Sequence, residues 1–201
     1  MINIKRFKNQ LLQDTSGATL MEFGLVVGPL MLILLGTIDL GYKGYMDTMI
    51  KSKVHQVARD ASTGEMTVAG IEQAVEDGLD PLLLKGSTVT VTVRSYFDFT
   101  NIGKPEKLTF DADGNGEVDP GDCYIDSNKN DIFDTDYGQS GTGGPDDIVS
   151  YEVNVTSPRL FPLPGLFGAS DQMKISSSTA VRNQPFGAQV DLVETCISDL
   201  D

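Results

Sequence analysis

The sequence has few of the side chains on which most catalysis and metal chemistry depend. Its 201 residues include one histidine, His55, and two cysteines, Cys123 and Cys196. A histidine-based triad, a credible Cys–His pair, zinc-ligand spacing and a glycine-rich phosphate loop are therefore all missing. His55 lies four residues from both Lys51 and Arg59, as expected for the solvated face of a helix. We expect no enzymatic activity.

Basic residues are also scarce. The chain has 15 Lys and Arg against 29 Asp and Glu, which gives a net charge of -14. Such acidity argues against nucleic acid or anionic lipid as a partner. The acids are concentrated in residues 111–147, which contain eleven acids and one base, Lys129.

A long apolar run lies near the N-terminus, and Glu22 is the only charged residue between Asp14 and Asp39. Residues Phe23 to Ile38 are uncharged, and Glu22 comes directly before them. The run is shorter than the roughly 20 residues that cross a bilayer, but residues 18–21 complete a span. We therefore expect a transmembrane helix over residues 18–41. A carboxylate inside such a helix costs about 2.5–3.5 kcal/mol, so Glu22 needs a partner in the assembled state.

The residues before the apolar run resemble a processing site. Gly17 is followed by A-T-L-M-E and preceded by a leader with Lys5, Arg6 and Lys8, as in type IV prepilins and pseudopilins. The pattern A-T-L-M-E-F-G-L-V-V-G-P-L-M-L-I-L-L-G is most similar to TadE-like minor pilins of tight-adherence systems. An ordinary signal peptide or signal anchor is the alternative, but signal peptides place small residues after the apolar core.

This resemblance implies a function. A prepilin peptidase would cut between Gly17 and Ala18, removing the leader, residues 1–17. Glu22 would become the fifth residue of the mature chain and neutralise the amino terminus of a neighbouring subunit. The implied protein is a minor pilin that spans the inner membrane once and exposes residues 42–201 outside the cytoplasm or in a surface pilus. Its partners would be other pilin subunits, the peptidase and the inner-membrane assembly platform.

The hydrophobic periodicity predicts an α+β fold. The helical pattern continues past Asp39 to Ala61, and a second helix is expected over residues 67–80. Beyond it the period changes to two, which predicts strands. The expected strands are residues 88–93, 149–156 and 173–182, with a short edge at 108–110. A long helix packed on a small antiparallel sheet is also what the pilin resemblance implies.

Within the acidic segment, residues 111–137, oxygen-bearing side chains alternate with other residues. Such spacing turns successive side chains toward one centre, and calcium takes six to eight oxygen ligands. The first loop has glycine at its sixth position. Its candidate ligands are Asp111, Asp113, Asn115, Glu117 through its carbonyl, Asp119 and Asp122.

A second loop follows directly. Its candidate ligands are Asp126, Asn128, Asn130, Ile132 through its carbonyl, and Asp134. It lacks glycine at the sixth position and has Tyr137 at the twelfth. Both loops resemble the calcium loops of dockerins and thrombospondin type 3 repeats more than an EF-hand, whose twelfth ligand is glutamate. The alternative for both is a solvated acidic loop. A calcium-dependent adhesion module held by an uncleaved signal anchor is therefore the second candidate function.

Two further features concern packing. Cys123 and Cys196 are expected to form one disulfide in an exported protein, with two buried thiols as the alternative. Large apolar residues also surround two prolines between positions 160 and 167, which cannot easily fold inward as regular structure. We expect an exposed contact patch there rather than core cover. Its members are Leu160, Phe161, Leu163, Leu166 and Phe167.

Overall fold

The computed structural model describes residues 16–184 and 187–197. Helix α2 runs without interruption over Ser16–Ala61, so the apolar run and the amphipathic segment after Asp39 form one helix, as predicted. Helix α3, Val68–Leu79, follows after a short turn. Thr67 caps it by accepting a hydrogen bond from the backbone N–H of Gly70. The expected leader lies outside the described residues, apart from its last two positions.

The main sheet has four antiparallel strands in the order β4-β1-β5-β6. Its strands are β1 (Thr88–Tyr96), β4 (Gln139–Ser140), β5 (Ile148–Pro158) and β6 (Gln172–Arg182). The three strands predicted from alternation are all present. In β5, alternation places Val149, Tyr151, Val153 and Val155 on one face, and each is at most 2% exposed.

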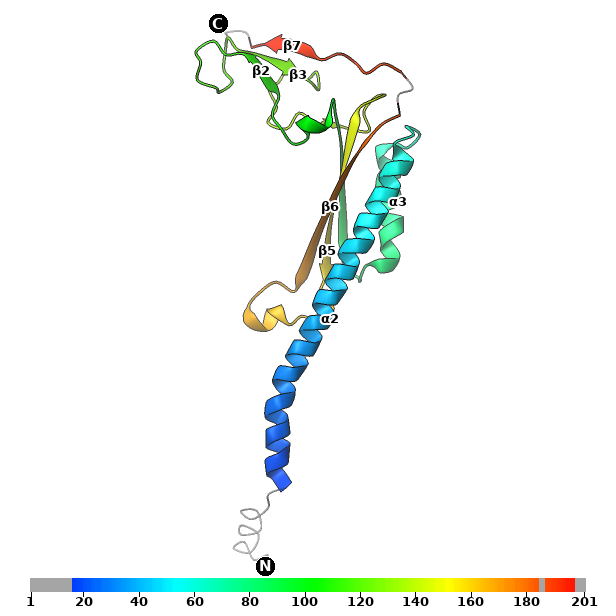
Figure 1. The fold of residues 1–201 in the computed structure, drawn as a ribbon, viewed down its shortest axis with the longest axis vertical. Coiled ribbons are helices and arrows are strands. Elements are labelled where there is room, and N and C mark those ends of the chain that lie inside the picture. Colours follow the sequence, from blue (N-terminus) through cyan, green and yellow to red (C-terminus); the bar gives the residue numbers. More distant parts are fainter. Residues whose placement is uncertain (1–15, 185–186, 198–201) are drawn as a thin grey trace, which may run out of the picture. The chain divides into compact units, whose positions relative to one another are not determined.

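The C-terminal half of α2 packs on this sheet, and the α+β fold is confirmed. Its buried residues recur at helical spacing, and Figure 1 shows β5 and β6 running along this half of the helix. They are Met46, Ile50, Val54, Val57, Ala58 and Ala61. Helix α3 contributes Ile71, Val75 and Leu79 to the buried residues.

A second, smaller sheet was predicted only in part. It has three antiparallel strands in the order β2-β3-β7, of which only β2, Lys107–Phe110, was expected. Strands β3, Cys123–Asp126, and β7, Val193–Cys196, have four residues each. They are too short for periodicity to indicate them. Short 3-10 turns complete the fold: η1 (Asp80–Leu82), η2 (Phe99–Asn101) and η3 (Pro164–Phe167).

The chain divides into two compact units. One contains α2 up to Gly44 together with the loop from Arg159 to Asp171. The other contains residues 45–158 and the chain from Gln172 onward, and so holds both sheets and α3. The apolar loop that the sequence singled out therefore belongs to the same unit as the apolar half of α2.

Candidate functional site

The residues of the expected processing site lie in the first turns of α2. Gly17 is exposed, and a Cβ placed on it would meet nothing within 4 Å. Glu22 is also exposed, and within the described part of the chain its carboxylate has no ion-pair partner. Large apolar side chains surround it on the helix: Leu20, Met21, Phe23 and Leu25 are 64–79% exposed. By length and composition this half of α2 could cross a membrane, and α2 is the one helix of that kind among the described residues.

In the first acidic loop, the leading carboxylate organises the backbone. Asp111 accepts the N–H of Gly114 at 2.6 Å and that of Gly116 at 2.9 Å. Both glycines have positive φ, 75° and 78°, which L side chains adopt only at a cost. Hydrogen bonds, the one from Gly116 foremost, lower the pKa of Asp111.

The other candidate ligands of this loop converge. The side-chain amide of Asn115 donates to Asp113 at 2.8 Å and to Asp119 at 3.0 Å. Asp122 closes the loop, because its carboxylate accepts the N–H of Ala112 at 2.8 Å and that of Asp119 at 3.1 Å. It is fully buried. The first, third, fifth, ninth and twelfth positions are thus held in one network.

The second loop repeats this backbone conformation. Asp126 accepts the N–H of Lys129 at 2.6 Å and that of Asp131 at 2.8 Å, so the third and fifth residues after the leading acid again donate. Lys129 and Asp131 have φ of 61° and 60°, although neither is glycine. The missing sixth-position glycine therefore does not prevent the turn.

The remaining side chains of the second loop also converge as in the first. Asp134 accepts side-chain N–H groups from Asn128 at 2.6 Å and from Asn130 at 2.8 Å. The fifth-position amide and the ninth-position acid are paired in both loops. The two loops are therefore structural repeats of one another, joined by β3.

Glu106 supplies the carboxylate that the second loop lacks at its twelfth position, where Tyr137 stands. Its carboxylate accepts the N–H of Ser127 at 2.7 Å and that of Asp134 at 3.1 Å. Ser127 and Asp134 are the second and ninth residues of the second loop. In the first loop, the backbone N–H groups at the same two positions donate to Asp122. Glu106 is 3% exposed, and burial raises its pKa. The sequence does not indicate this role of Glu106, because Glu106 precedes the loop by 20 positions and no local spacing connects the two.

The carboxylates of both loops are engaged with N–H groups in this structure. Among the residues that the structure describes, no group of three or more His, Cys, Asp or Glu side chains forms a metal cage. The donors are nevertheless of the kind calcium prefers, carboxylate and amide oxygens. A carboxylate has about four lone-pair sites, so an oxygen that accepts one N–H can still ligate a cation.

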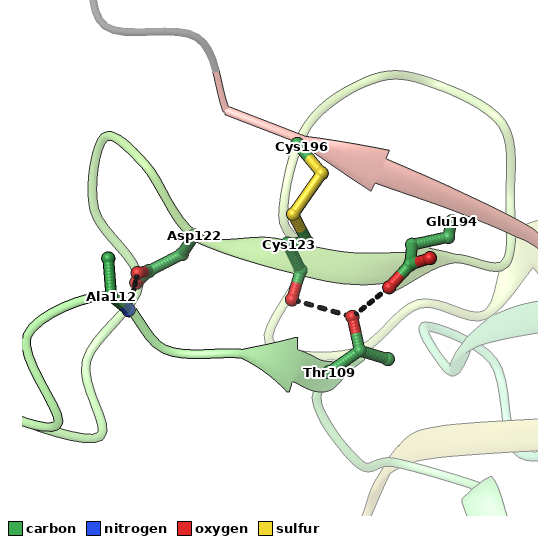
Figure 2. Close-up of a disulfide and its surroundings, with 6 residues drawn as sticks. All are labelled: Thr109, Ala112, Asp122, Cys123, Glu194 and Cys196. Carbon is green, nitrogen blue, oxygen red and sulfur yellow. Dashed lines mark hydrogen bonds between the residues drawn. A yellow bond between two sulfur atoms is a disulfide. The ribbon is translucent and has the colours of Figure 1, made fainter.

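A disulfide closes the sheet next to the first loop. Cys123 and Cys196 face each other in the β3–β7 pair and are bonded, as the sequence led us to expect. Figure 2 shows Thr109 beside them, donating to the carbonyl of Cys123 at 3.0 Å and to Glu194 at 2.6 Å. Asp122, the last residue of the first loop, directly precedes Cys123. The disulfide therefore fixes the end of the loop to the C-terminal strand.

Comparison with known proteins supports the reading of the N-terminal helix. Residues 17–62 match the family described as TadE-like protein. No functionally curated protein and no solved structure shows significant similarity to the chain. The match begins at Gly17 and covers nearly all of α2, the part with the unpaired Glu22 and the exposed apolar surface. This segment is therefore similar to TadE-like proteins, while the match does not extend to the two sheets.

Proposed function

We propose that the chain is a minor pilin that a prepilin peptidase cleaves between Gly17 and Ala18. The mature protein would then take part in assembly of the pilus or enter it. The TadE-like match supports this proposal because it begins at the residue expected to precede the cut. The exposed position of Gly17 in the first turn of α2 also suits access by a membrane peptidase.

The observation that carries the proposal is the carboxylate of Glu22, which has no ion-pair partner among residues 16–184 and 187–197. It lies among exposed apolar side chains on a helix that can span a membrane. Cleavage would create a cation, the amino group of Ala18, four residues or about 6 Å along the axis from Glu22. A neighbouring parallel helix shifted by about one turn would place its amino group level with Glu22. The cost of the buried carboxylate is then relieved only in the assembly.

The partners follow from the same surface. Helices of other pilin subunits would cover the exposed apolar side chains of α2, and the assembly platform in the inner membrane would receive the processed subunit. The domain formed by residues 45–158 and 172–201 would lie outside the cytoplasm. The Cys123–Cys196 disulfide supports this placement, since disulfides persist in oxidising compartments.

We also propose that the two acidic loops bind calcium after export. Asp122 would complete the first site and Glu106 the second, each at the position that holds the second and ninth N–H groups of its loop. A bound cation would offset the repulsion among the eleven acids of residues 111–147. Extracellular calcium modules bind at about 0.1–1 mM, which suits a segment that orders only outside the cell.

Assembly of a Glu22→Leu variant tests the function. We expect the variant to insert into the membrane normally and to be missing from sheared pili, or to leave the cells without pili. Immunogold labelling of sheared pili detects the first outcome, and electron microscopy of whole cells the second. Met21→Leu, on the same exposed part of the helix, is the matched control and should assemble. Glu22→Leu pili that equal the parent in number and labelling would refute the neutralising role.

A further inference from the structure

A ten-residue loop beside the apolar half of α2 has large apolar side chains and no charge. It spans residues 160–169 and connects β5 to β6 through the turn η3. Leu166 is 71% exposed and Phe167 is 79% exposed, and Leu160 adds a third large apolar side chain at 40%. This exposure agrees with the contact patch expected from the sequence. The loop therefore has an apolar surface that is not used in the folded core.

The loop lies against the part of α2 that can span a membrane. Leu32 of the helix and Leu163, Pro164, Phe167 and Ala169 of the loop line one shallow apolar groove within one compact unit. Leu32 is in the middle of the uncharged run that ends at position 38. In Figure 1, η3 accordingly lies next to α2. Whatever medium surrounds Leu32 must also reach the tip of the loop.

An ion pair joins the start of the loop to helix α2. Arg159 Nη1 donates to Asp39 Oδ2 at 2.7 Å, and the N–H of Phe161 donates to Asp39 Oδ1 at 3.5 Å. Asp39 is the first charge after the apolar run and marks the end of the hydrocarbon span. Leu32 precedes it by seven residues, which is about 10 Å along a helix. The loop thus starts at the level of the membrane surface and returns about 10 Å into it, close to the depth of interfacial elements.

The backbone of the loop is also suited to a medium without water. Inside lipid, every N–H group needs a partner within the protein. Positions 162 and 164 are prolines and have no N–H. Four of the other N–H groups donate to carbonyls of the loop itself, at 2.8–3.2 Å: Leu163 to Phe161, Leu166 to Leu163, Gly168 to Gly165 and Ala169 to Pro164.

We propose that residues 160–169 insert into the bilayer leaflet at the Asp39 end of α2, with phospholipid acyl chains filling the groove beside Leu32. The chain would then hold the membrane at two places, by its helix and by this loop. The loop must then be withdrawn before a subunit leaves the membrane. This inference rests on the membrane anchor of the proposed function, but not on peptidase cleavage or pilus assembly.

Tryptophan fluorescence tests the proposal directly, because the chain has no tryptophan. The full-length chain with Phe167→Trp is placed in phosphatidylcholine nanodiscs at one copy per disc. We expect blue-shifted emission, loss of most of it in discs with brominated acyl chains, and little quenching by aqueous acrylamide. Leu166→Trp should behave alike. Phe23→Trp on α2 is the positive control, and Phe110→Trp, 56% exposed on β2, is the aqueous control.

Three results would overturn the proposal. If the loop tryptophans are quenched by acrylamide but not by brominated lipid, while Phe23→Trp responds to lipid, the loop lies in water although the anchor stands. If they are shielded only in discs with two or more copies, a neighbouring chain covers the groove instead of lipid. If Phe23→Trp also fails to respond to brominated lipid, the membrane anchor is wrong and the proposed function is contradicted with it.

Discussion

Arg159 and Asp39 are 120 positions apart in the sequence and form an ion pair at 2.7 Å. Their side chains are 20% and 8% exposed, so solvent screens the pair weakly. Removing one partner of a buried pair typically costs about 3–5 kcal/mol, because the other charge stays buried alone. We expect Arg159→Gln to lower the free energy of unfolding by an amount near the lower end of this range. Adding Asp39→Asn should restore part of it.

A double-mutant cycle in detergent micelles measures this coupling. The pair Lys51–Asp47 is the matched control, with the same 2.7 Å separation but side chains 53% and 37% exposed. Exposed ion pairs between residues four positions apart on a helix contribute only about 0.3–0.5 kcal/mol to stability. Equal coupling energies for the two pairs would show that Arg159 does not fix the apolar loop to α2.

Calcium should raise the thermal stability of the full-length chain. A ligand at 100 times its dissociation constant adds about 2.7 kcal/mol to the free energy of unfolding. Asp111→Ala should remove the contribution of the first loop, and Glu106→Gln that of the second. Asp77→Ala, an exposed acid of α3, is the control and should keep the full calcium response. Melting curves that do not change with millimolar calcium or with chelator would leave both loops as plain acidic surface.

The sixth positions of the two loops should respond oppositely to substitution. Gly116 and Asp131 both have positive φ, which costs a residue with a side chain roughly 1–2 kcal/mol. We expect Gly116→Ala to lower the free energy of unfolding in chelator by about this amount, and Asp131→Gly to leave it unchanged or raise it. Gly44→Ala on α2 is the control, because a helical glycine with nothing within 4 Å of its added Cβ should gain about 0.5–1 kcal/mol. Stabilisation by Gly116→Ala would contradict the shared conformation.

Stability should fall in alkali partly through Tyr151. Burial raises the pKa of this phenol from 10.0 to about 12, and its hydroxyl has no hydrogen-bond partner among the described residues. The fold thus favours the neutral form. The corresponding stability is complete below pH 10 and is lost as the pH rises toward 12. Tyr151→Phe should reduce this alkaline loss and stabilise the protein by about 1 kcal/mol at neutral pH, because it removes an unsatisfied polar group.

Denaturant titrations across this pH range measure the effect. Tyr45→Phe is the control, because Tyr45 is 52% exposed on α2. If Tyr151→Phe unfolds in parallel with the parent at every pH, ionisation of Tyr151 does not contribute. Burial also raises the pKa of Tyr96, Tyr124 and Tyr137, and we expect these three phenols to contribute to the alkaline loss that remains.

Local periodicity predicted the elements that are long enough to show it. The unbroken helix α2, the face of α3 and the alternation in β5 could all be predicted, because the burial of each residue follows from its spacing. Strands β3 and β7 could not, since four residues give no clear period. Their pairing depends on a partner 73 residues away through Cys123 and Cys196. Two of the three strands of the small sheet are therefore products of tertiary contact.

In the candidate sites, too, local features could be predicted from the sequence and long-range contacts could not. The alternation of oxygen side chains indicated where both acidic loops lie, since each set of candidate ligands is nearly contiguous in sequence, and calcium binding stays a prediction. The role of Glu106 and the contact of the apolar loop with Leu32 could not be predicted, because both join segments that are distant along the chain. The positive φ of Asp131 could not be predicted for another reason. Aspartate tolerates positive φ better than most residues, so a sixth-position glycine is favourable but not required.

The N-terminal sequence of the chain isolated from the membranes of piliated cells shows whether a peptidase removes the leader. Removal of the leader distinguishes a processed pilin from a calcium-dependent adhesion module held by an uncleaved anchor. We predict Ala18 as the first residue, and the precursor should accumulate in a Gly17→Leu variant but not in Gly24→Leu, a glycine on the same helix with equal space around it. A chain that begins at Met1 in both parent and variant would contradict the account.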